Sequence, residues 1–229
     1  DFKSQLLIFG KNMQQFIPQP VSHFLGLEFN VVSHLERVVS ALGGFLGILL
    51  VIWISYYLLG AKEATLIVAS MGASAVLLFA VPHGALSQPW PLVMGHLVSA
   101  VIGVTCARLV PHELLAAPLA VALAIVAMHY LRCIHPPGGA TALTAVIGGI
   151  NIQALGYQYV ITPVLLNVMI LLVVAIMVNY FFPWRRYPAS FKQPEKVLEK
   201  IAETSGDNAL LSHSDLEYAL RQVDSFIDV

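Results

Sequence analysis

Charged residues are scarce in this chain, and they are almost missing from its middle. Asp, Glu, Lys and Arg make up 11% of the 229 residues, whereas a soluble domain carries about 25%. Between residues 64 and 194, Glu113 is the one acidic residue. Hydrophobic residues make up 58% of the chain, and the mean hydropathy is +0.77. This composition excludes a soluble surface and indicates an integral membrane protein.

Cysteine is scarce as well, and neither sign of charge dominates. Cys106 and Cys133 lie in apolar surroundings, where cysteine usually serves as a small packing residue, and two are too few for a disulfide framework. The formal charge of −1 gives no reason to expect a nucleic-acid partner. The chain has no P-loop, G-x-S-x-G or H-E-x-x-H motif. We therefore expect neither an enzyme nor an ATP-driven pump, and no cofactor.

Five apolar segments are long enough to cross the roughly 30 Å hydrocarbon core of a bilayer as helices. Their expected bounds are Ala41–Leu59, Ala64–Val81, Leu92–Val110, Leu114–Ile134 and Pro163–Phe182. A sixth segment, Gly138–Ile150, crosses only if residues 151–161 continue its path, and otherwise it turns back. Six crossings would place most basic residues on the side that holds both termini, namely Lys3, Lys11, Arg37, Arg132, Arg185, Arg186 and Lys192. By the positive-inside rule we expect six crossings, both termini cytoplasmic, in a bacterial inner membrane.

The regions on either side of the transmembrane domain, residues 33–184, differ from it in composition. Residues 1–32 have the pattern of an interfacial segment, and Ser33 with Glu36 forms a capping box before the first apolar run. The stretch Trp184–Tyr187 has the composition of an aromatic and basic anchor at the cytoplasmic face. Residues 185–229 read as a cytoplasmic linker and an amphipathic tail helix. The apolar face of that helix needs a partner, either a regulatory domain beyond residue 229 or a second protomer in a homodimer.

The chain contains a short internal repeat, which we call the echo. Residues 71–79, MGASAVLLF, align without gaps with residues 138–146, GGATALTAV. Each stretch lies in the second segment of a three-segment half, 41–110 and 114–182. Because three is an odd number, the halves would enter the membrane in opposite orientations, which is the inverted-repeat plan of transporters with broken helices. Chance remains the alternative explanation, since small residues are common in membrane helices.

The sequence His135-Pro136-Pro137 predicts a break inside the second half. A residue before proline avoids the α region, and proline suits the first turn of a new helix. The free amides of such a half-helix would form an anion site, where glycine permits close approach. The first half-helix N-terminus would comprise Gly138, Gly139, Ala140 and Thr141. If the repeat holds, Gly72, Ala73 and Ser74 form a second one that faces it.

Three further polar residues are candidates for the same site, and each could instead have a purely structural role. His135 could contact the anion or merely cap a helix, while His96 and Asn167 could line the pathway or bond to a neighbouring helix. Small residues at every fourth position, namely Gly95, Ser99, Gly103 and Ala107, most simply serve close helix packing. Without carboxylates at depth, the segments suit a small inorganic anion or a neutral solute better than a cation. Two other functions stay open: a transition-metal transporter that uses intramembrane His and Cys, and a sensory module whose output domain lies beyond residue 229.

These motifs together resemble a known family. The stretch HPPGGATAL at 135–143 is similar to the signature of the HPP family of integral membrane proteins, and GASAVLLFAVP at 72–82 and DLEYALRQVDSFIDV at 215–229 support the resemblance. The resemblance implies a transporter-like protein, and it points to nitrite because cyanobacterial and plastid members are associated with nitrite transport. Some bacterial members carry CBS domains after the tail helix.

Overall fold

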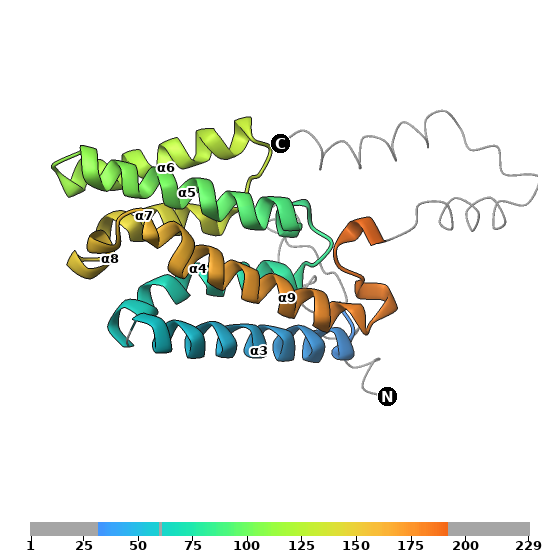
Figure 1. Ribbon diagram of the computed structural model, residues 1–229. Helices are drawn as coiled ribbons and strands as arrows, with labels where there is room; N and C mark the ends of the chain where they lie inside the picture. The colour runs from blue at the N-terminus through green and yellow to red at the C-terminus, as the bar shows by residue number, and fades with distance from the viewer. Residues whose placement is uncertain (1–31, 60, 192–229) are drawn as a thin grey trace, which may run out of the picture. The chain divides into compact units, whose positions relative to one another are not determined.

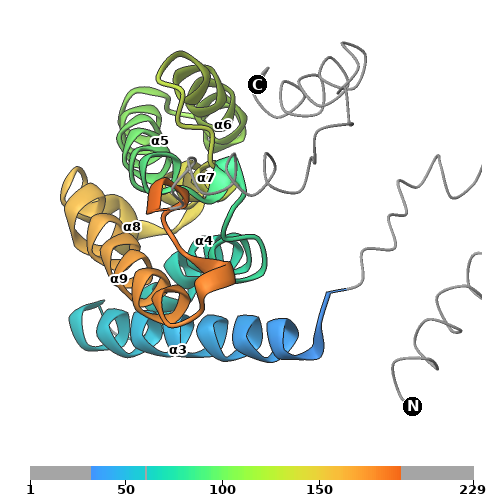
Figure 2. The ribbon, with the colours of Figure 1, turned by 90° about the vertical axis from the view of Figure 1, so that its right-hand side faces the viewer.

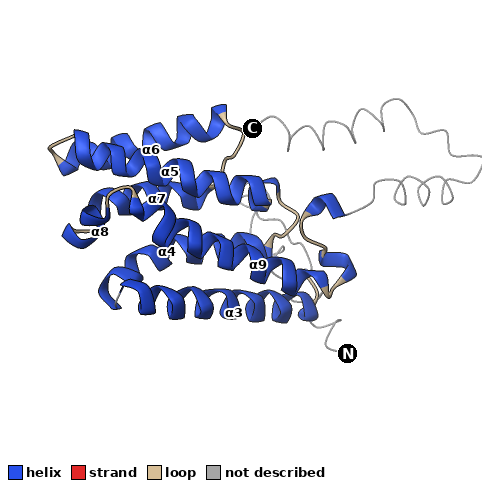
Figure 3. Cartoon of the chain, viewed as in Figure 1, coloured by secondary structure: helices blue, strands red, loops and turns tan. Residues whose placement is uncertain are grey.

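The computed structural model describes residues 32–59 and 61–191, and within them every regular element is helical (Figures 1 and 3). The main helices are α3 (His34–Leu59), α4 (Ala61–Ala80), α5 (Pro89–Leu109), α6 (Glu113–Tyr130), α7 (Pro136–Ile147), α8 (Ile150–Leu155) and α9 (Leu166–Tyr180). Short helical turns accompany them, namely η1 (Ala85–Ser87), η2 (Val160–Leu165), η3 (Pro183–Arg185) and η4 (Ala189–Phe191). The predicted interfacial segment and tail helix lie outside the described residues.

Four helices in the described part are long and apolar enough to cross a membrane. They span His34–Tyr57, Pro89–Leu109, Glu113–Tyr130 and Val160–Tyr180, and Val68–Ala80 of α4 forms a shorter apolar helix. At 1.5 Å per residue, 20 residues reach about 30 Å. The all-helical membrane class is therefore confirmed. α7 has 12 residues, or about 18 Å, so it does not cross as a single helix.

Some predicted helix ends agree with the structure, and others do not. The Ser33 hydroxyl accepts the amide N–H of Glu36 at 3.2 Å, as a capping residue does. A new helix begins at Pro136, as the double proline predicted. The helix before it ends at Tyr130 rather than at Ile134, because the chain turns at Arg132, whose φ is +50°, and runs extended at His135.

The predicted half-helix N-terminus at Gly72–Ser74 is wrong. α4 runs without a break from Ala61 to Ala80, so Gly72 lies in its middle. The backbone amides there lie inside the helix, where the i→i−4 pattern gives them partners. A single glycine costs a helix only about 1 kcal/mol, which its neighbours readily offset.

The helices of the body that begins at Val38 pack through small residues. In both views α5 and α6 lie side by side, and α7 lies between this pair and α4 (Figures 1 and 2). A Cβ added to Gly103 of α5 would come within 2.5 Å of the carbonyl oxygen of Ala142 in α7. One added to Gly43 of α3 would come within 2.9 Å of the Phe79 ring in α4. These glycines serve close packing, as the sequence predicted.

The segment after α9 folds back onto the bundle. The Tyr187 hydroxyl is buried and donates to the carbonyl of Ser87 at 2.8 Å. The Arg185 guanidinium, 1% exposed, donates to Asn179 at 2.9 Å, to Ser40 at 3.0 Å and to the carbonyl of Phe79. Arg185 is therefore not the interfacial anchor that the sequence predicted. A carbonyl near the C-terminal end of a helix has no hydrogen-bond partner within the helix. The Arg185 cation supplies a partner and interacts favourably with the negative end of the helix dipole.

Candidate functional site

Four polar side chains meet in the interior, between α4, α5 and α7. We call Ser74, His96, His135 and Thr141 the polar cluster. The Ser74 hydroxyl lies 2.8 Å from Nε2 of His96 and 2.9 Å from Nε2 of His135. Nδ1 of His96 lies 2.7 Å from the Thr141 hydroxyl. The cluster thus links two helices and the start of a third through one continuous set of hydrogen bonds.

The backbone brings His135 into this cluster. Proline at the next position holds His135 in an extended conformation, with φ −140° and ψ 101°, as the N-cap of α7. Gly95 of α5 makes room for it, because a Cβ there would lie 2.6 Å from the Cβ of His135. Nδ1 of His135 then lies 2.8 Å from the carbonyl oxygen of Leu86 in η1. The HPP motif therefore both ends one segment and places an imidazole against its neighbours.

The polar cluster is fully enclosed. All four side chains have a relative exposure of 0%, and the two imidazole centroids are 5.0 Å apart. Within the described residues, every buried side-chain nitrogen or oxygen has a hydrogen-bond partner. A buried polar group without a partner costs about 1–3 kcal/mol, so this mutual satisfaction is what makes the enclosed cluster stable. In this state its donors and acceptors are turned toward each other.

The first turn of α7 offers fewer amides than the sequence predicted. Pro136 and Pro137 have no N–H, and the amide of Gly138 donates to the carbonyl of His135 at 2.8 Å. The prediction that Gly138 presents a free amide is therefore wrong. Gly138 serves packing instead, since a Cβ there would lie 2.7 Å from the Gly95 carbonyl oxygen and 2.8 Å from the Ser99 hydroxyl.

The remaining predicted residues lie apart from the polar cluster. Gly139 is half-buried and faces α6, with Val121 3.9 Å from a Cβ built there. Ala73 and Ala140 are exposed. Asn167 is buried, but its side chain exchanges two hydrogen bonds with Ser55 of α3, at 3.1 and 2.8 Å. Asn167 therefore joins α9 to α3, which is the structural role that the sequence left open for it, a bond to a neighbouring helix.

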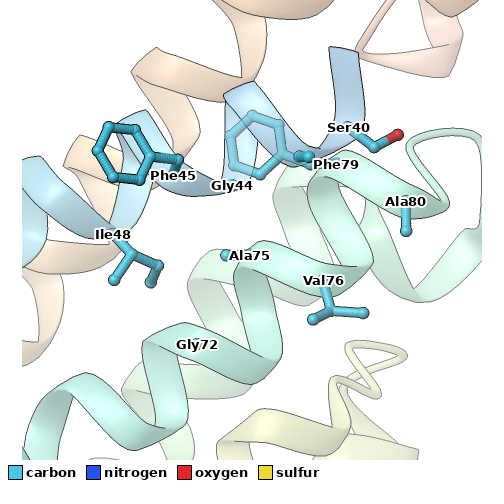
Figure 4. Close-up of a pocket in the computed structure, with 10 residues that line it drawn as sticks. Ser40, Gly44, Phe45, Ile48, Gly72, Ala75, Val76, Phe79 and Ala80 are labelled. Atoms are coloured by element: carbon cyan, nitrogen blue, oxygen red, sulfur yellow. The ribbon is translucent and has the colours of Figure 1, made fainter. Parts of the chain in front are cut away.

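Gly72 lies on a different face of α4 from Ser74. It lines an apolar groove of about 370 Å³ between α3 and α4, together with Gly44, Phe45, Ala75 and Val76 (Figure 4). Two residues along a helix rotate a side chain by about 200°, so Gly72 and Ser74 cannot point the same way. The shared motif GASA thus divides between a groove and the polar cluster.

Two contributors to the polar cluster were absent from the sequence prediction. The carbonyl of Leu86 belongs to a connecting turn, and backbone atoms give no residue-type signal. Tyr159 is 1% exposed, and its hydroxyl donates to the carbonyl of Thr141 at 3.0 Å. Its position in the polar stretch 151–161 is the only sequence feature that could have drawn attention to it.

Metal ligands do not gather at this site. Among the described residues, no group of three or more His, Cys, Asp or Glu side chains could hold an ion. His96 and His135 contribute two imidazoles, whereas zinc and copper sites use three or four ligands. Burial raises the pKa of the Cys133 thiol, and a thiol binds metal as the thiolate.

Comparison with known proteins gives one family and two relatives. The model of a family described as HPP, transmembrane region, matches residues 30–188. A transmembrane protein of Dictyostelium discoideum is 40% identical over 153 residues, which cover 65% of this chain and 49% of the relative. A second from the same organism is 38% identical over 151 residues, or 64% and 53%. The chain spans about half the length of these relatives, and no solved structure matches it.

Proposed function

Because the chain belongs to the HPP transmembrane family, we propose that it transports a small inorganic anion across a membrane. Nitrite is the first candidate, because the resemblance to cyanobacterial and plastid members points to it. The relatives from Dictyostelium discoideum are described only as transmembrane proteins, so they add no substrate, and the choice of an anion over a cation rests on the chemistry of the polar cluster.

The polar cluster is the observation that supports an anion. Its hydroxyl and imidazole groups donate O–H and N–H bonds, and it contains no carboxylate. Cation sites in membrane proteins commonly use acidic side chains or several oxygen ligands. A small anion that enters beside the polar cluster could accept from the Ser74 and Thr141 hydroxyls and from an N–H of a protonated imidazole.

A separation of α4 from α5 and α7 would open the polar cluster. Gly95, Gly103 and Gly138 bring the backbones of α5 and α7 into direct contact, so this pair is expected to move as one body. α4 reaches the cluster through the single side chain of Ser74. Transporters with repeated halves commonly alternate access by rocking one bundle against the other. In such a motion the two bonds of Ser74 break as the site opens and form again as it closes, while the α5–α7 contact stays.

We propose six crossings arranged as two inverted halves, α3–α5 and α6–α9, with α7 and α8 completing one crossing together. Ser74 and Thr141 align in the sequence echo, and their hydroxyls bond to the two nitrogens of the same imidazole, His96. Bonds from His135 to Leu86 and from Ala189 to Gln88 join segments at one end of the bundle. Ser74 and Thr141 occupy corresponding positions in the two halves and bond to opposite sides of one imidazole, which supports an inverted repeat.

The remaining proposals concern location and assembly. Arg132 and Arg186 belong to the same end of the bundle as the turn between α4 and α5, so the positive-inside rule would place that end, with both termini, in the cytoplasm. A bacterial inner membrane remains the proposed location, although both relatives come from a eukaryote. We further propose that the protein forms a homodimer. We do not propose that it is an enzyme.

A second candidate function is a transition-metal transporter. The two imidazoles favour it, but in the part of the chain that the structure describes no third ligand joins them. A sensory module would depend on residues 192–229 and on an output domain beyond residue 229. Binding of Zn²⁺ or Cu⁺ to the purified protein that is lost in a His96→Ala/His135→Ala double variant would favour the metal transporter.

The test of the proposed function is nitrite exchange in proteoliposomes. Thr141→Val removes one cluster hydroxyl at nearly constant shape, and Thr144→Val makes the same change one turn later, where the hydroxyl bonds only to the carbonyl of Ala140. We expect Thr141→Val to slow exchange about tenfold or more, since an unpartnered buried polar group costs about 1–3 kcal/mol, and Thr144→Val to match the wild type. If the wild-type protein shows no nitrite exchange, nitrite is not its substrate. Equal exchange in both variants would remove Thr141 from the site.

A further inference from the structure

We propose that the anion is carried together with a proton, and that the polar cluster is the proton's path in the order Thr141, His96, Ser74, His135. This inference rests on the proposed function, because it names a second substrate for the same site. Three features of the cluster support it: the direction of each hydrogen bond, the spare acceptors nearby and the charge around the four side chains.

The carbonyl of Leu86 sets the direction of every bond in the cluster. A carbonyl only accepts, so Nδ1 of His135 must carry the proton that points at it. In a neutral imidazole Nε2 is then an acceptor, and Ser74 donates to it. The Ser74 oxygen accepts from Nε2–H of His96, which leaves Nδ1 of His96 to accept from Thr141. With both imidazoles neutral, one assignment satisfies all four bonds, and all of them run the same way.

The cluster can take up one more proton without losing a partner. The Ser74 hydroxyl lies 3.3 Å from the carbonyl of Ser70, and the Thr141 hydroxyl lies 3.4 Å from that of Pro137. Each hydroxyl can therefore turn its hydrogen to a carbonyl of its own helix when the facing imidazole nitrogen becomes a donor. Serine and threonine form such i−4 bonds readily in helices.

The transfer itself balances. An incoming proton binds the oxygen of Thr141 while the original hydroxyl proton of Thr141 passes to Nδ1 of His96. The new hydroxyl proton turns to the carbonyl of Pro137, and His96 becomes an imidazolium. Nε2–H of His96 then passes its proton to the oxygen of Ser74, while the proton of Ser74 passes to Nε2 of His135. His96 returns to neutral as the other tautomer, and His135 becomes the imidazolium. Nδ1 of His135 then releases its proton to water at the turn of Leu86, so that one proton enters and one leaves. Both imidazoles return to their first tautomers by proton exchange with water when α4 separates and opens the cluster.

A charge on this relay needs a counter-charge that the protein does not provide there. Two other titratable residues adjoin the cluster: Tyr159, whose hydroxyl donates to the carbonyl of Thr141, and Cys133, which is buried two residues before His135. On the packed elements, charged residues lie near helix ends or in connections, namely Lys62 and Glu63 in the first turn of α4, Arg108, Glu113, Arg132, and Arg185 of η3, which bonds to the end of α4. The exposed histidines among the described residues are His34, His83, His112 and His129. An unpaired buried charge is costly, so an imidazolium is stable only while the anion is present. Proton and anion should therefore move together.

The experiment measures protons and nitrite in the same proteoliposomes at pH 7.5. Valinomycin with equal potassium on both sides clamps the voltage, a trapped dye reports internal pH, and protein-free vesicles give the passive entry of nitrous acid. We expect a proton to enter the wild-type vesicles with each nitrite. Ser74→Ala should lower proton entry per nitrite by about a hundredfold, the lower end of what a positioned proton-transfer group contributes. Ser99→Ala is the matched control, because Ser99 is buried on α5 one turn after His96 and bonds only weakly, to Met128 at 3.9 Å.

Each outcome decides a different point. No nitrite flux in the wild type overturns the proposed function and the coupling with it. Nitrite flux without protons overturns the coupling and leaves anion transport standing. Coupling that survives Ser74→Ala overturns the relay. If Ser74→Ala abolishes nitrite flux as well, His96→Gln is measured, and loss of flux there too assigns the cluster to binding and overturns the relay.

Discussion

Replacing Gly103 by alanine is the sharpest test of how closely α5 and α7 pack. The new Cβ would lie 2.5 Å from the carbonyl oxygen of Ala142, 2.9 Å from its Cα and 2.8 Å from the Cβ of Ala145. None of these atoms is the far end of a flexible side chain, so the side chain cannot turn away. Restoring an ordinary contact of 3.4 Å requires the two helices to separate by about 0.9 Å.

The expected cost combines two opposing terms. Overpacking costs about 1–3 kcal/mol, and three contacts with atoms that cannot move place Gly103→Ala at the upper end. Alanine in place of glycine regains up to about 1 kcal/mol of helix propensity. We therefore expect a net loss of about 2 kcal/mol of unfolding free energy. Gly72→Ala is the matched control, since no atom lies within 4 Å of its Cβ, and it should gain about 0.5–1 kcal/mol.

Denaturant unfolding of both variants in the same detergent would give the two free energies. Because the polar cluster depends on α5 and α7, Gly103→Ala should also slow nitrite exchange, whereas Gly72→Ala should not. A Gly103→Ala protein as stable as the Gly72→Ala protein would refute the close approach, and with it the treatment of α5 and α7 as one body.

Three further predictions concern residues outside the polar cluster. Arg185→Met should lower stability by about 3 kcal/mol, because a charged group loses bonds to Ser40, Asn179 and the end of α4; thermal unfolding in detergent measures it. Asn167→Ala should cost about 1–2 kcal/mol through its lost bonds to Ser55 and leave nitrite exchange unchanged, whereas slower exchange at unchanged stability would return Asn167 to the site. Burial raises the pKa of the Tyr187 hydroxyl, so its contribution is complete below a tyrosine's ordinary pKa of about 10 and falls as the pH rises above it. Tyr187→Phe should cost about 1 kcal/mol at neutral pH and show a smaller alkaline loss in unfolding measured from pH 8 to 11.

The apolar helices of this protein could be predicted in approximate position from the sequence, whereas their six crossings stay a prediction. Long apolar runs have to form helices in a bilayer, because backbone groups there find no water. The break at His135 could be predicted too, since two prolines restrict the backbone whatever surrounds them. By the same local rule a break at Gly72 was expected from the echo with Gly139, and it was wrong. Glycine permits a break, whereas proline imposes one.

The membrane class, the HPP motif and the residue types of the candidate site were therefore determined by the sequence, which is local information. Which of these residues meet was decided only by the tertiary structure. Ser74, His96, His135 and Thr141 come together because the facing sides of α4, α5 and α7 are set by glycine contacts between helices. Asn167 and Arg185, equally polar in the sequence, bond elsewhere. A sequence shows which side chains share a helix face, but the partner of that face depends on how whole helices fit together.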